Sequence, residues 1–344
     1  MTSWYLESGP ESDVVISTRI RLARNLKDVL FPVRITKGDE VKLLKKVEDA
    51  LPGRSRLKNE TGNLKFIRME DLDNMTKMSM VERHLISPEF AMKNGAAGLV
   101  LSDDENISIM VNEEDHLRIQ TLYPGMQLEK AWEACGRVDD MMEGRLEYAF
   151  DERFGYLTCC PTNVGTGIRA SVMAHLPALV MTGHIRSVLD VVNKVGMAIR
   201  GLYGEGTEAL GNMFQISNQV SLGQAEEEII SNLSAVSRRI VEQERVARQH
   251  LMKDRAKLED KLCRSFGILA NSRIISSDEA IRLLSDVKLG IHLGIIDEVT
   301  PETINHLMIV IQPATLQKSL GKSVEAQERD MERAEIIRTS LRGK

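Results

Sequence analysis

Arginines recur on short alternating segments of this chain, and together their side chains could bind an anion. Arg19 and Arg21 lie two residues apart in VVISTRIRL, where polar and apolar residues alternate with the period of a β-strand. Arg118, Arg169 and Arg200 follow on other predicted strands or at the exit of a loop. Guanidinium donors match phosphate oxygens in pairs, so these arginines on one sheet face would suit a triphosphate. For Arg19 and Arg21 alone, a solvated edge strand is the simpler interpretation.

Acidic residues lie close to two of these arginines. Glu114 stands four residues before Arg118, and Glu205 stands five residues after Arg200. Carboxylates beside a phosphate site would repel the anion unless they served a metal ion or a cationic second substrate. A guanidinium group as the second substrate would resolve this conflict.

The segment CPTNVGTGIRAS (160–171) leads from a thiol to one of the arginines. Its proline and two glycines predict a tight loop between Pro161 and Gly167, whose backbone could approach a ligand closely. No Gly-Lys-Ser/Thr follows the glycines, so the segment is not a P-loop. An ordinary glycine-containing hairpin loop is the alternative interpretation.

The elements expected to position these residues are short strands joined by hairpins. Regular βαβ alternation is missing, so we predict an α+β fold with a largely antiparallel sheet flanked by helices. The predicted helices cover residues 39–51, 71–85, 129–142 and 177–195, the last with an interruption near Gly183. The predicted strands cover residues 14–22, 64–67, 98–101, 107–111, 117–122, 146–150, 156–159, 168–176, 197–202 and 214–222.

From Gln224 onward the pattern is helical throughout. Apolar spacing over 224–262 predicts one long helix or two successive helices. Ser276 begins a capping box, Thr300 caps a further helix, and a last helix is expected over 323–341. We therefore predict an all-α C-terminal domain, which divides the chain into residues 1–252 and 253–344. Appended helical units of this kind often form a homodimer.

Composition excludes several classes of protein. The chain has 344 residues, of which 42% are hydrophobic, which is enough for two domains with cores. Its formal net charge of −5 gives no general attraction to nucleic acid. The four cysteines lack the spacing of a zinc site, and reduced thiols fit a cytoplasmic protein. Neither a signal peptide nor an apolar run long enough to span a membrane is found.

Four segments together resemble the phosphagen kinases, the ATP:guanidino phosphotransferases such as arginine and creatine kinase. They are STRIR (17–21), NEEDHLR (112–118), CPTNVGTGIRAS (160–171) and RGLYGE (200–205), in the order of the family. The second and third are highly specific in combination, and the resemblance covers roughly residues 12–250. It implies the guanido-kinase catalytic fold and transfer of the γ-phosphoryl group of ATP to a guanidinium.

The resemblance also implies roles for single residues. Glu114 and Glu205 would clamp the guanidinium, and one of them would accept its proton. Cys160 as a thiolate would help to orient the same group, although a small buried apolar residue is the alternative. Mg²⁺ would bridge the phosphates without a metal site in the protein itself. The residues expected to bind ATP are Ser17, Thr18, Arg19, Ile20, Arg21, His84, Arg118, Arg169, Ala170, Ser171, Val172, Met173, Arg200, Gly201, Leu202, Tyr203, Gly204 and Glu205.

The chain departs from the phosphagen kinases in two respects. We expect their helical N-terminal domain to be absent, because STRIR begins at residue 17, and a helical C-terminal domain is present instead. Met173 also stands where a phosphagen kinase would have a histidine near the nucleotide base. The arrangement resembles the bacterial protein-arginine kinases of the Clp stress-response system. This implies unfolded proteins and transcriptional repressors as substrates, with the Clp ATPase and protease machinery and an activator protein as partners.

The segment RDMERA (329–334) lies on the last predicted helix. A solvated helix face with a local pair between Asp330 and Arg333 is the simple interpretation. The segment also resembles the phosphoarginine-reading motif of protein-arginine kinases, which ends at Ala334 here. That resemblance implies that Arg329 and Arg333 bind the phosphate while Asp330 pairs with the guanidinium.

Two other functions stay open at the level of sequence. One is a metabolic phosphagen kinase acting on free arginine, and the other is a non-catalytic adaptor that reads phosphoarginine for a Clp protease. The combination of Glu114, Glu205 and Cys160 argues against the adaptor. The sequence favours a protein-arginine kinase.

Overall fold

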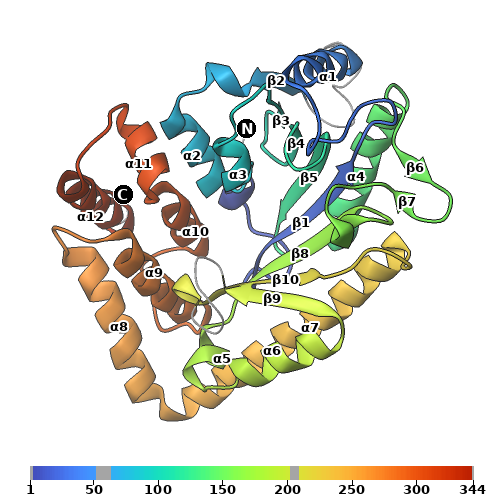
Figure 1. Cartoon of the computed structure of the whole chain (residues 1–344). Helices are drawn as coiled ribbons and strands as arrows, with labels where there is room; N and C mark the ends of the chain where they lie inside the picture. Colours follow the sequence, from blue (N-terminus) through green and yellow to red (C-terminus); the bar gives the residue numbers. More distant parts are fainter. Residues whose placement is uncertain (1–2, 52–62, 202–208, 343–344) are drawn as a thin grey trace.

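A sheet of eight strands forms the centre of the computed structural model, which describes residues 3–51, 63–201 and 209–342 (Figure 1). The strand order is β2-β3-β4-β5-β1-β8-β10-β9, and every neighbouring pair is antiparallel. The predicted α+β fold with an antiparallel sheet is therefore confirmed. The strands are β1 Val15–Arg24, β2 Leu64–Arg68, β3 Gly98–Ser102, β4 Ile107–Val111, β5 Leu117–Pro124, β8 Ile168–His175, β9 Met197–Gly201 and β10 Met213–Asn218.

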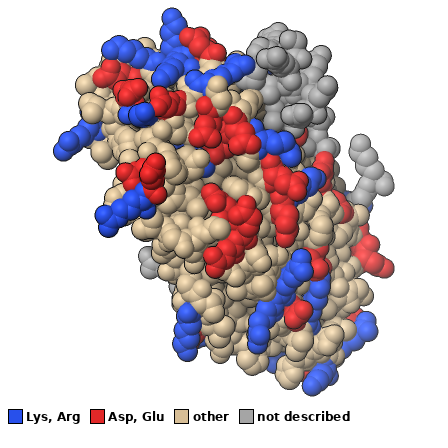
Figure 2. Space-filling model, turned by 90° about the vertical axis from the view of Figure 1, so that its right-hand side faces the viewer, with Lys and Arg blue, Asp and Glu red and all other residues tan. Residues whose placement is uncertain are grey.

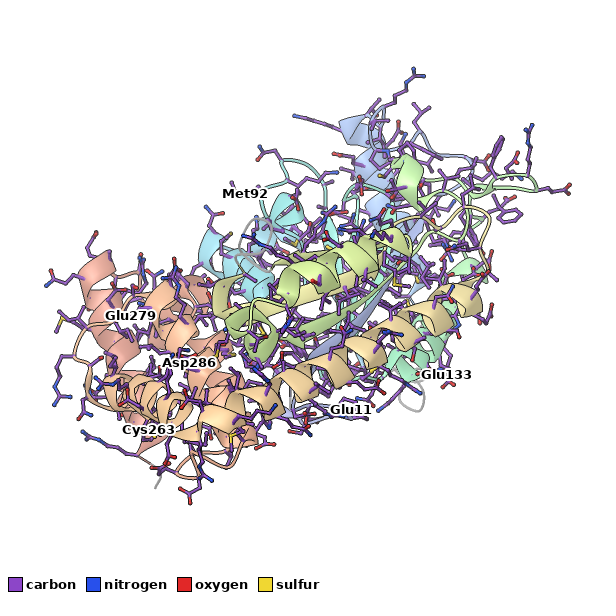
Figure 3. The ribbon with its side chains drawn as sticks, turned by 90° about the horizontal axis from the view of Figure 1, so that it is seen from below. Glu11, Met92, Glu133, Cys263, Glu279 and Asp286 are labelled. Atoms are coloured by element: carbon purple, nitrogen blue, oxygen red, sulfur yellow. The ribbon has the colours of Figure 1, made fainter. Side chains whose placement is uncertain are left out.

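Helices cover one face of the sheet. Alternate residues of the strands, such as Ile20, Ile119 and Val172, are fully buried on that face. They pack in one core with α4 (Leu128–Glu143) and α7 (Glu226–Leu251), whose apolar residues recur every three or four positions. Figure 3 shows α7 running along this side of the molecule toward the C-terminal helices. The remaining helices of this part are α1 Lys37–Ala50, α2 Asn74–Glu82, α3 Pro88–Ala91, α5 Pro177–Met181 and α6 Ile185–Lys194.

The C-terminal helices have an apolar core of their own, which includes Leu262, Leu284 and Leu307. Ser276 accepts a hydrogen bond from Glu279 N and Thr300 accepts one from Thr303 N, as their capping signals predict. The predicted run over 224–262 consists of two helices, because a 3-10 turn at Met252–Asp254 separates α7 from α8. These helices are α8 Arg255–Asn271, α9 Ser277–His292, α10 Pro301–Val310, α11 Pro313–Leu320 and α12 Ala326–Leu341.

Some predicted elements have other bounds in the structure. The helix expected over 71–85 begins only at Asn74, because Asp73 caps it by accepting from Thr76 N at 2.8 Å. The strands expected over 146–150 and 156–159 are a two-stranded ribbon of β6 (Phe150–Asp151) and β7 (Gly155–Tyr156). Helix α11 was not predicted, and it lies beside α2 (Figure 1). Further short 3-10 helices are Trp4–Leu6, Met69–Asp71, Pro161–Asn163 and Leu210–Asn212.

The outer surface mixes charges of both signs. Figure 2 shows Lys and Arg side chains interspersed with Asp and Glu on one face, in line with the 45 basic and 50 acidic residues of the chain. Among the helices of the described residues, none has both the length and the hydropathy needed to cross a bilayer.

Candidate active site

The register of the sheet brings the predicted arginines onto one face. Residues paired directly across two strands share a face, and Arg21 of β1 is paired with Arg169 of β8. On its other side β1 pairs Ala23 with Arg118 of β5. Arg200 of β9 is paired with Gln215 of β10. Gln215 is in turn paired with Met173 of β8, which lies on the same face as Arg169. This is the face opposite to the core formed with α4 and α7.

The arginines line a cleft of about 460 Å³ on that face. The turn at Glu114 and the loop from Cys160 to Gly167 also reach its rim, so the cleft combines cations with a carboxylate and a thiol. The lining residues are Arg19, Arg21, Ala23, Glu114, Arg118, Cys160, Thr162, Asn163, Gly167, Arg169, Arg200, Gly201 and Gln215. Four residues predicted at this site, Leu202, Tyr203, Gly204 and Glu205, lie outside the described residues.

The cations of the cleft are held close together without full compensation. Burial, with the neighbouring charges of Arg19, Arg118 and Arg169, lowers the pKa of Arg21 well below its ordinary value. Burial and the charge of Arg200 likewise lower the pKa of Arg169. The Nε atoms of Arg21 and Arg169 are buried and have no hydrogen-bond partner among the described residues. Such unpaired donors and mutual repulsion favour binding of a multiply charged anion.

The three consecutive acids after Asn112 do three different things. Glu113 is nearly buried and accepts from Arg118 Nη1 at 2.8 Å and from Ser87 Oγ at 2.6 Å, so it fixes the arginine. Glu114 accepts from Arg118 Nη2 at 2.8 Å, but its side chain is 44% exposed and is accessible from the cleft. Sequence reasoning had assigned a role only to Glu114.

Asp115, the third acid, positions the neighbouring loop. It is fully buried, and its Oδ1 accepts from Asn25 Nδ2 at 2.6 Å and from Cys159 N at 2.7 Å. These bonds join the turn at Glu114 to the residue before Cys160. The sequence signal for this role was weak, because three adjacent acids are usually read as a solvated turn.

The loop after Cys160 is fastened to the sheet. The Cys160 Sγ lies 3.0 Å from Thr162 Oγ1. Arg24 donates from Nη1 to Thr166 O at 2.9 Å, pairs with Asp139 at 2.7 Å and is itself buried. At Gly167, where φ is +68°, an added Cβ would lie 2.6 Å from a backbone oxygen of β1. The glycine is needed there because the loop passes close to the strand.

A narrow cavity continues from the cleft along the sheet. Arg19 and Gln215, joined by a 2.8 Å hydrogen bond, line both. Burial and the charge of Arg19 lower the pKa of His84 to about 4, so this imidazole is neutral. Its backbone has φ of +62°, and its carbonyl accepts from Gln120 Nε2 at 2.9 Å. The cavity is lined by Ser17, Arg19, His84, Leu122, Ser171, Met173 and Gln215.

Four residues predicted to bind ATP turn away from the cleft. Thr18, Ile20, Ala170 and Val172 are fully buried on the core face, as strand alternation requires. Thr18 Oγ1 donates to Gly125 O at 2.7 Å, which is a structural contact. On β1 and β8, the alternate residues Arg19, Arg21 and Arg169 point to the cleft instead.

The RDMERA segment lies on α12, among the C-terminal helices. Arg333 is 1% exposed and donates to Ile311 O and Ile275 O, each at 2.9 Å, besides its pair with Asp330. Within the part of the chain that the structure describes, the buried Nε atom of Arg329 has no hydrogen-bond partner. Ala334 is fully buried. Arg333 thus supports the local fold, whereas Arg329 has an unused donor.

Comparisons with known proteins identify two family models that match this chain. Residues 42–247 match the family model of the ATP:guanido phosphotransferase C-terminal catalytic domain. Residues 255–344 match the model of the protein-arginine kinase McsB C-terminal domain.

Similar proteins and structures extend this result. The protein-arginine kinase of Halothermothrix orenii is 50% identical over 342 residues, 99% of this chain and 97% of that protein. The protein-arginine kinase of Geobacillus stearothermophilus is 49% identical over 343 residues, which are 99% of this chain and 94% of that protein.

Solved structures share the fold of about two thirds of this chain. Lombricine kinase has a TM-score of 0.60 at 24% identity, with 69% of this chain and 68% of that chain covered. The duplicated taurocyamine kinase of Schistosoma mansoni has a TM-score of 0.58 at 26% identity. The match covers 67% of this chain and 33% of that chain. The chain therefore belongs to the ATP:guanido phosphotransferase family and, within it, to the protein-arginine kinases.

Proposed function

We propose that this protein-arginine kinase carries out its reaction in the arginine-lined cleft. The five arginines would hold the phosphates of ATP, and Glu114 with Glu205 would hold the arginine side chain of a protein substrate. The observation that carries the proposal is the row of partly buried arginines, two with unpaired Nε donors, facing a carboxylate and a thiol. The phosphates of ATP and a cationic arginine side chain could therefore bind next to each other in this cleft.

The chemistry follows from the charges. A guanidinium nitrogen attacks the γ-phosphorus of ATP, the N–P bond forms and the bond to the leaving ADP oxygen breaks. The nitrogen must lose a proton, and the carboxylate of Glu114 or Glu205 would accept it. Arg169 and its neighbours would offset the negative charge on the transferring group.

Cys160 would contact the guanidinium from the loop side of the cleft. Its Sγ lies beside Thr162 Oγ1, at the start of the loop that also carries Arg169 on its exit strand. A thiolate there would pair with a cationic substrate and would help to orient its attacking nitrogen.

Mg²⁺ belongs to the proposal as an ion held mainly by phosphate oxygens. In the part of the chain that the structure describes, no group of three or more His, Cys, Asp or Glu could hold a metal. The carboxylates of Glu113 and Glu114 are both bonded to Arg118. When bound with ATP, the ion would neutralise charge on the phosphates.

A comparison of two acceptors tests the function. With ATP and Mg²⁺, we expect acid-labile phosphate to accumulate on an unfolded protein that contains arginine, and little on free arginine. Detection by phosphoproteomics that preserves N–P bonds would assign the modified side chains. Labelling of free arginine alone would support the metabolic alternative, and absence of ATP turnover with both acceptors would support the adaptor.

We further propose that the C-terminal helices read phosphoarginine. The unused donor of Arg329 and the partly exposed carboxylate of Asp330 support this, since phosphate and guanidinium need one partner each. Arg333 would hold the site in shape through its two carbonyl contacts. The same proposal includes marking of substrates for the Clp machinery and regulation of the stress response by this kinase. It also includes transcriptional repressors as substrates, an activator protein as a partner and formation of a homodimer.

Removing the unused donor should weaken the reading of the product. We expect Arg329→Ala to bind free phosphoarginine about 10-fold to 100-fold more weakly, as for a lost hydrogen bond to a charged group. Calorimetric titration measures this, and Arg264→Ala, an exposed arginine of α8, is the matched control. Unchanged affinity in Arg329→Ala would place the phosphoarginine site elsewhere.

A further inference from the structure

A cavity between the sheet and the C-terminal helices continues the path that begins at the arginines. The narrow cavity beside the cleft has His84 and Met173 in its wall, and both residues also line this larger, mainly apolar cavity. Three spaces therefore follow one another: the arginine cleft, the narrow passage at Ser17 and the apolar cavity. This order matches the order of phosphates, sugar and base in a nucleotide.

The two walls of the apolar cavity come from different parts of the chain. Met173 of β8 and Met213 of β10 belong to the sheet. Met308 and Ile309 of α10 belong to the C-terminal helices, and Gln312 lies between α10 and α11. The wall from α10 is built from residues outside the part matched by the guanido-kinase family model, which ends at residue 247.

A bulge in β1 adds one more residue to this cavity. The register of β1 against β8 shifts between Val15 and Ser17, so that Ile16 turns out of the sheet core. Ile16 packs against the core of the C-terminal helices instead. Simple alternation had predicted Ile16 on the same face as Thr18. The bulge thus provides an apolar contact at the junction of the two parts.

The chemistry of the cavity suits a flat heterocycle. Methionine side chains pack well against aromatic rings, and Met173, Met213 and Met308 all line the space. The amide of Gln312 supplies a polar group at the edge, which could recognise a ring amine or ring nitrogen. The neutral imidazole of His84 can pack against a ring without bringing a charge into the cavity.

Charge sets the direction in which a nucleotide would lie. The carboxylates of Glu82 and Glu7 line the apolar cavity, whereas the arginines line the cleft. Phosphates would be repelled by the glutamates of the apolar cavity and attracted by the arginines of the cleft. The apolar cavity is thus left for the end of the nucleotide that carries no charge.

Hydrogen bonds hold the α10 wall against the catalytic part. The Glu82 carboxylate accepts from Ala314 N at 2.8 Å, from Thr315 N at 2.6 Å and from Thr315 Oγ1 at 2.7 Å, and so caps α11. Glu82 stands two residues before His84. On the other side of the wall, Arg333 donates to Ile311 O at 2.9 Å. The wall is therefore tied both to the segment that ends at His84 and to α12.

We propose that the base of ATP occupies this cavity, so that Met308, Ile309 and Gln312 of the C-terminal helices form half of the base-binding site. The proposal rests on the assignment of the arginine cleft to the phosphates. In this arrangement the C-terminal helices select the nucleotide, and any shift of α10 changes nucleotide affinity. Met173, which stands where the resemblance led us to expect a histidine, becomes part of an apolar base site.

Two ligands separate the base site from the phosphate site. ADP carries a base, whereas inorganic tripolyphosphate offers only phosphates, and the wild type should bind both. We expect Met308→Ala to bind ADP about tenfold or more weakly, as for a lost apolar contact in a pocket, with unchanged affinity for tripolyphosphate. Calorimetric titration of the full chain measures both affinities. Met92→Ala, at a methionine that is 74% exposed and does not line the cavity, is the matched control and should change neither (labelled in Figure 3).

A second variant covers the case that Met308→Ala does not fold. Retained binding of tripolyphosphate shows that a variant is folded, and Gln312→Leu keeps the size of the side chain while it removes the amide. We expect the same selective loss of ADP affinity. Unchanged ADP affinity in folded variants, or equal losses for ADP and tripolyphosphate in both, would overturn the base site. Failure of the wild type to bind tripolyphosphate would instead refute the assignment of the cleft.

Discussion

Replacing Arg169 by alanine is expected to lower kcat for phosphorylation of a protein substrate by about 10³-fold to 10⁵-fold, the loss typical of an arginine aimed at a transferring phosphoryl group. Arg169 faces the cleft directly opposite Arg21, and no described residue forms a hydrogen bond with its buried Nε atom. Its charge is destabilised by burial and by Arg200 until an anion arrives. Initial rates of acid-labile phosphate formation at saturating ATP measure the effect.

The stability of the same variant distinguishes a functional role from a structural one. Removal of a cation that other cations repel should leave the midpoint of thermal unfolding unchanged or raise it, because no hydrogen bond of Nε is lost. Arg169→Lys keeps the charge but not the planar fork and should recover only part of the rate. Arg153→Ala, on the exposed turn between β6 and β7, is the control and should keep full activity. Wild-type kcat in Arg169→Ala would locate the phosphates elsewhere.

The faces of the strands were predictable because alternation depends only on local sequence. Arg19 and Arg21 share a face in any strand with a period of two, and the same holds for the apolar residues opposite. Which strands lie side by side was not predictable in this way. The pairing of Arg21 with Arg169 joins residues far apart in the chain, and only the family motifs pointed to it.

Contacts that depend on three-dimensional proximity escaped sequence reasoning. The run Glu113-Glu114-Asp115 has no periodicity that separates a buried anchor from an exposed acid, so their different partners could not be assigned. The bulge that redirects Ile16 has no signal in an otherwise regular alternation. Helix α11 spans eight residues, too few for a clear period, and its cap comes from Glu82 in another part of the chain.

The C-terminal helices connect the proposed phosphoarginine site with the proposed base site. The proposed base site places α10 against the nucleotide, and the carbonyl of Ile311 at the end of α10 accepts from Arg333 of the RDMERA segment. A change at that segment would therefore reach the nucleotide through one hydrogen bond and one helix end. The proposed base site would thus have a physical connection to α12 within the same chain.

Replacing Glu114 by glutamine should remove the proton acceptor while the cleft keeps its shape. We expect kcat to fall by about 10²-fold to 10⁴-fold, the range typical of a lost general base, with ADP affinity unchanged. The reason is that Glu113 remains bonded to Arg118 at 2.8 Å, so the arginine that faces the phosphates keeps its position. Rates with a protein substrate and calorimetric titration of ADP give the two quantities.

Two comparisons make this last expectation specific. Glu113→Gln weakens the buried anchor of Arg118, so it should lower ADP affinity more than Glu114→Gln does. Glu133→Gln, at the labelled glutamate of α4 in Figure 3, should change neither quantity. If Glu114→Gln loses ADP affinity and turnover in the same proportion, Glu114 supports the nucleotide rather than the guanidinium. The proton would then pass to Glu205, and Glu205→Gln should show the selective loss of kcat in its place.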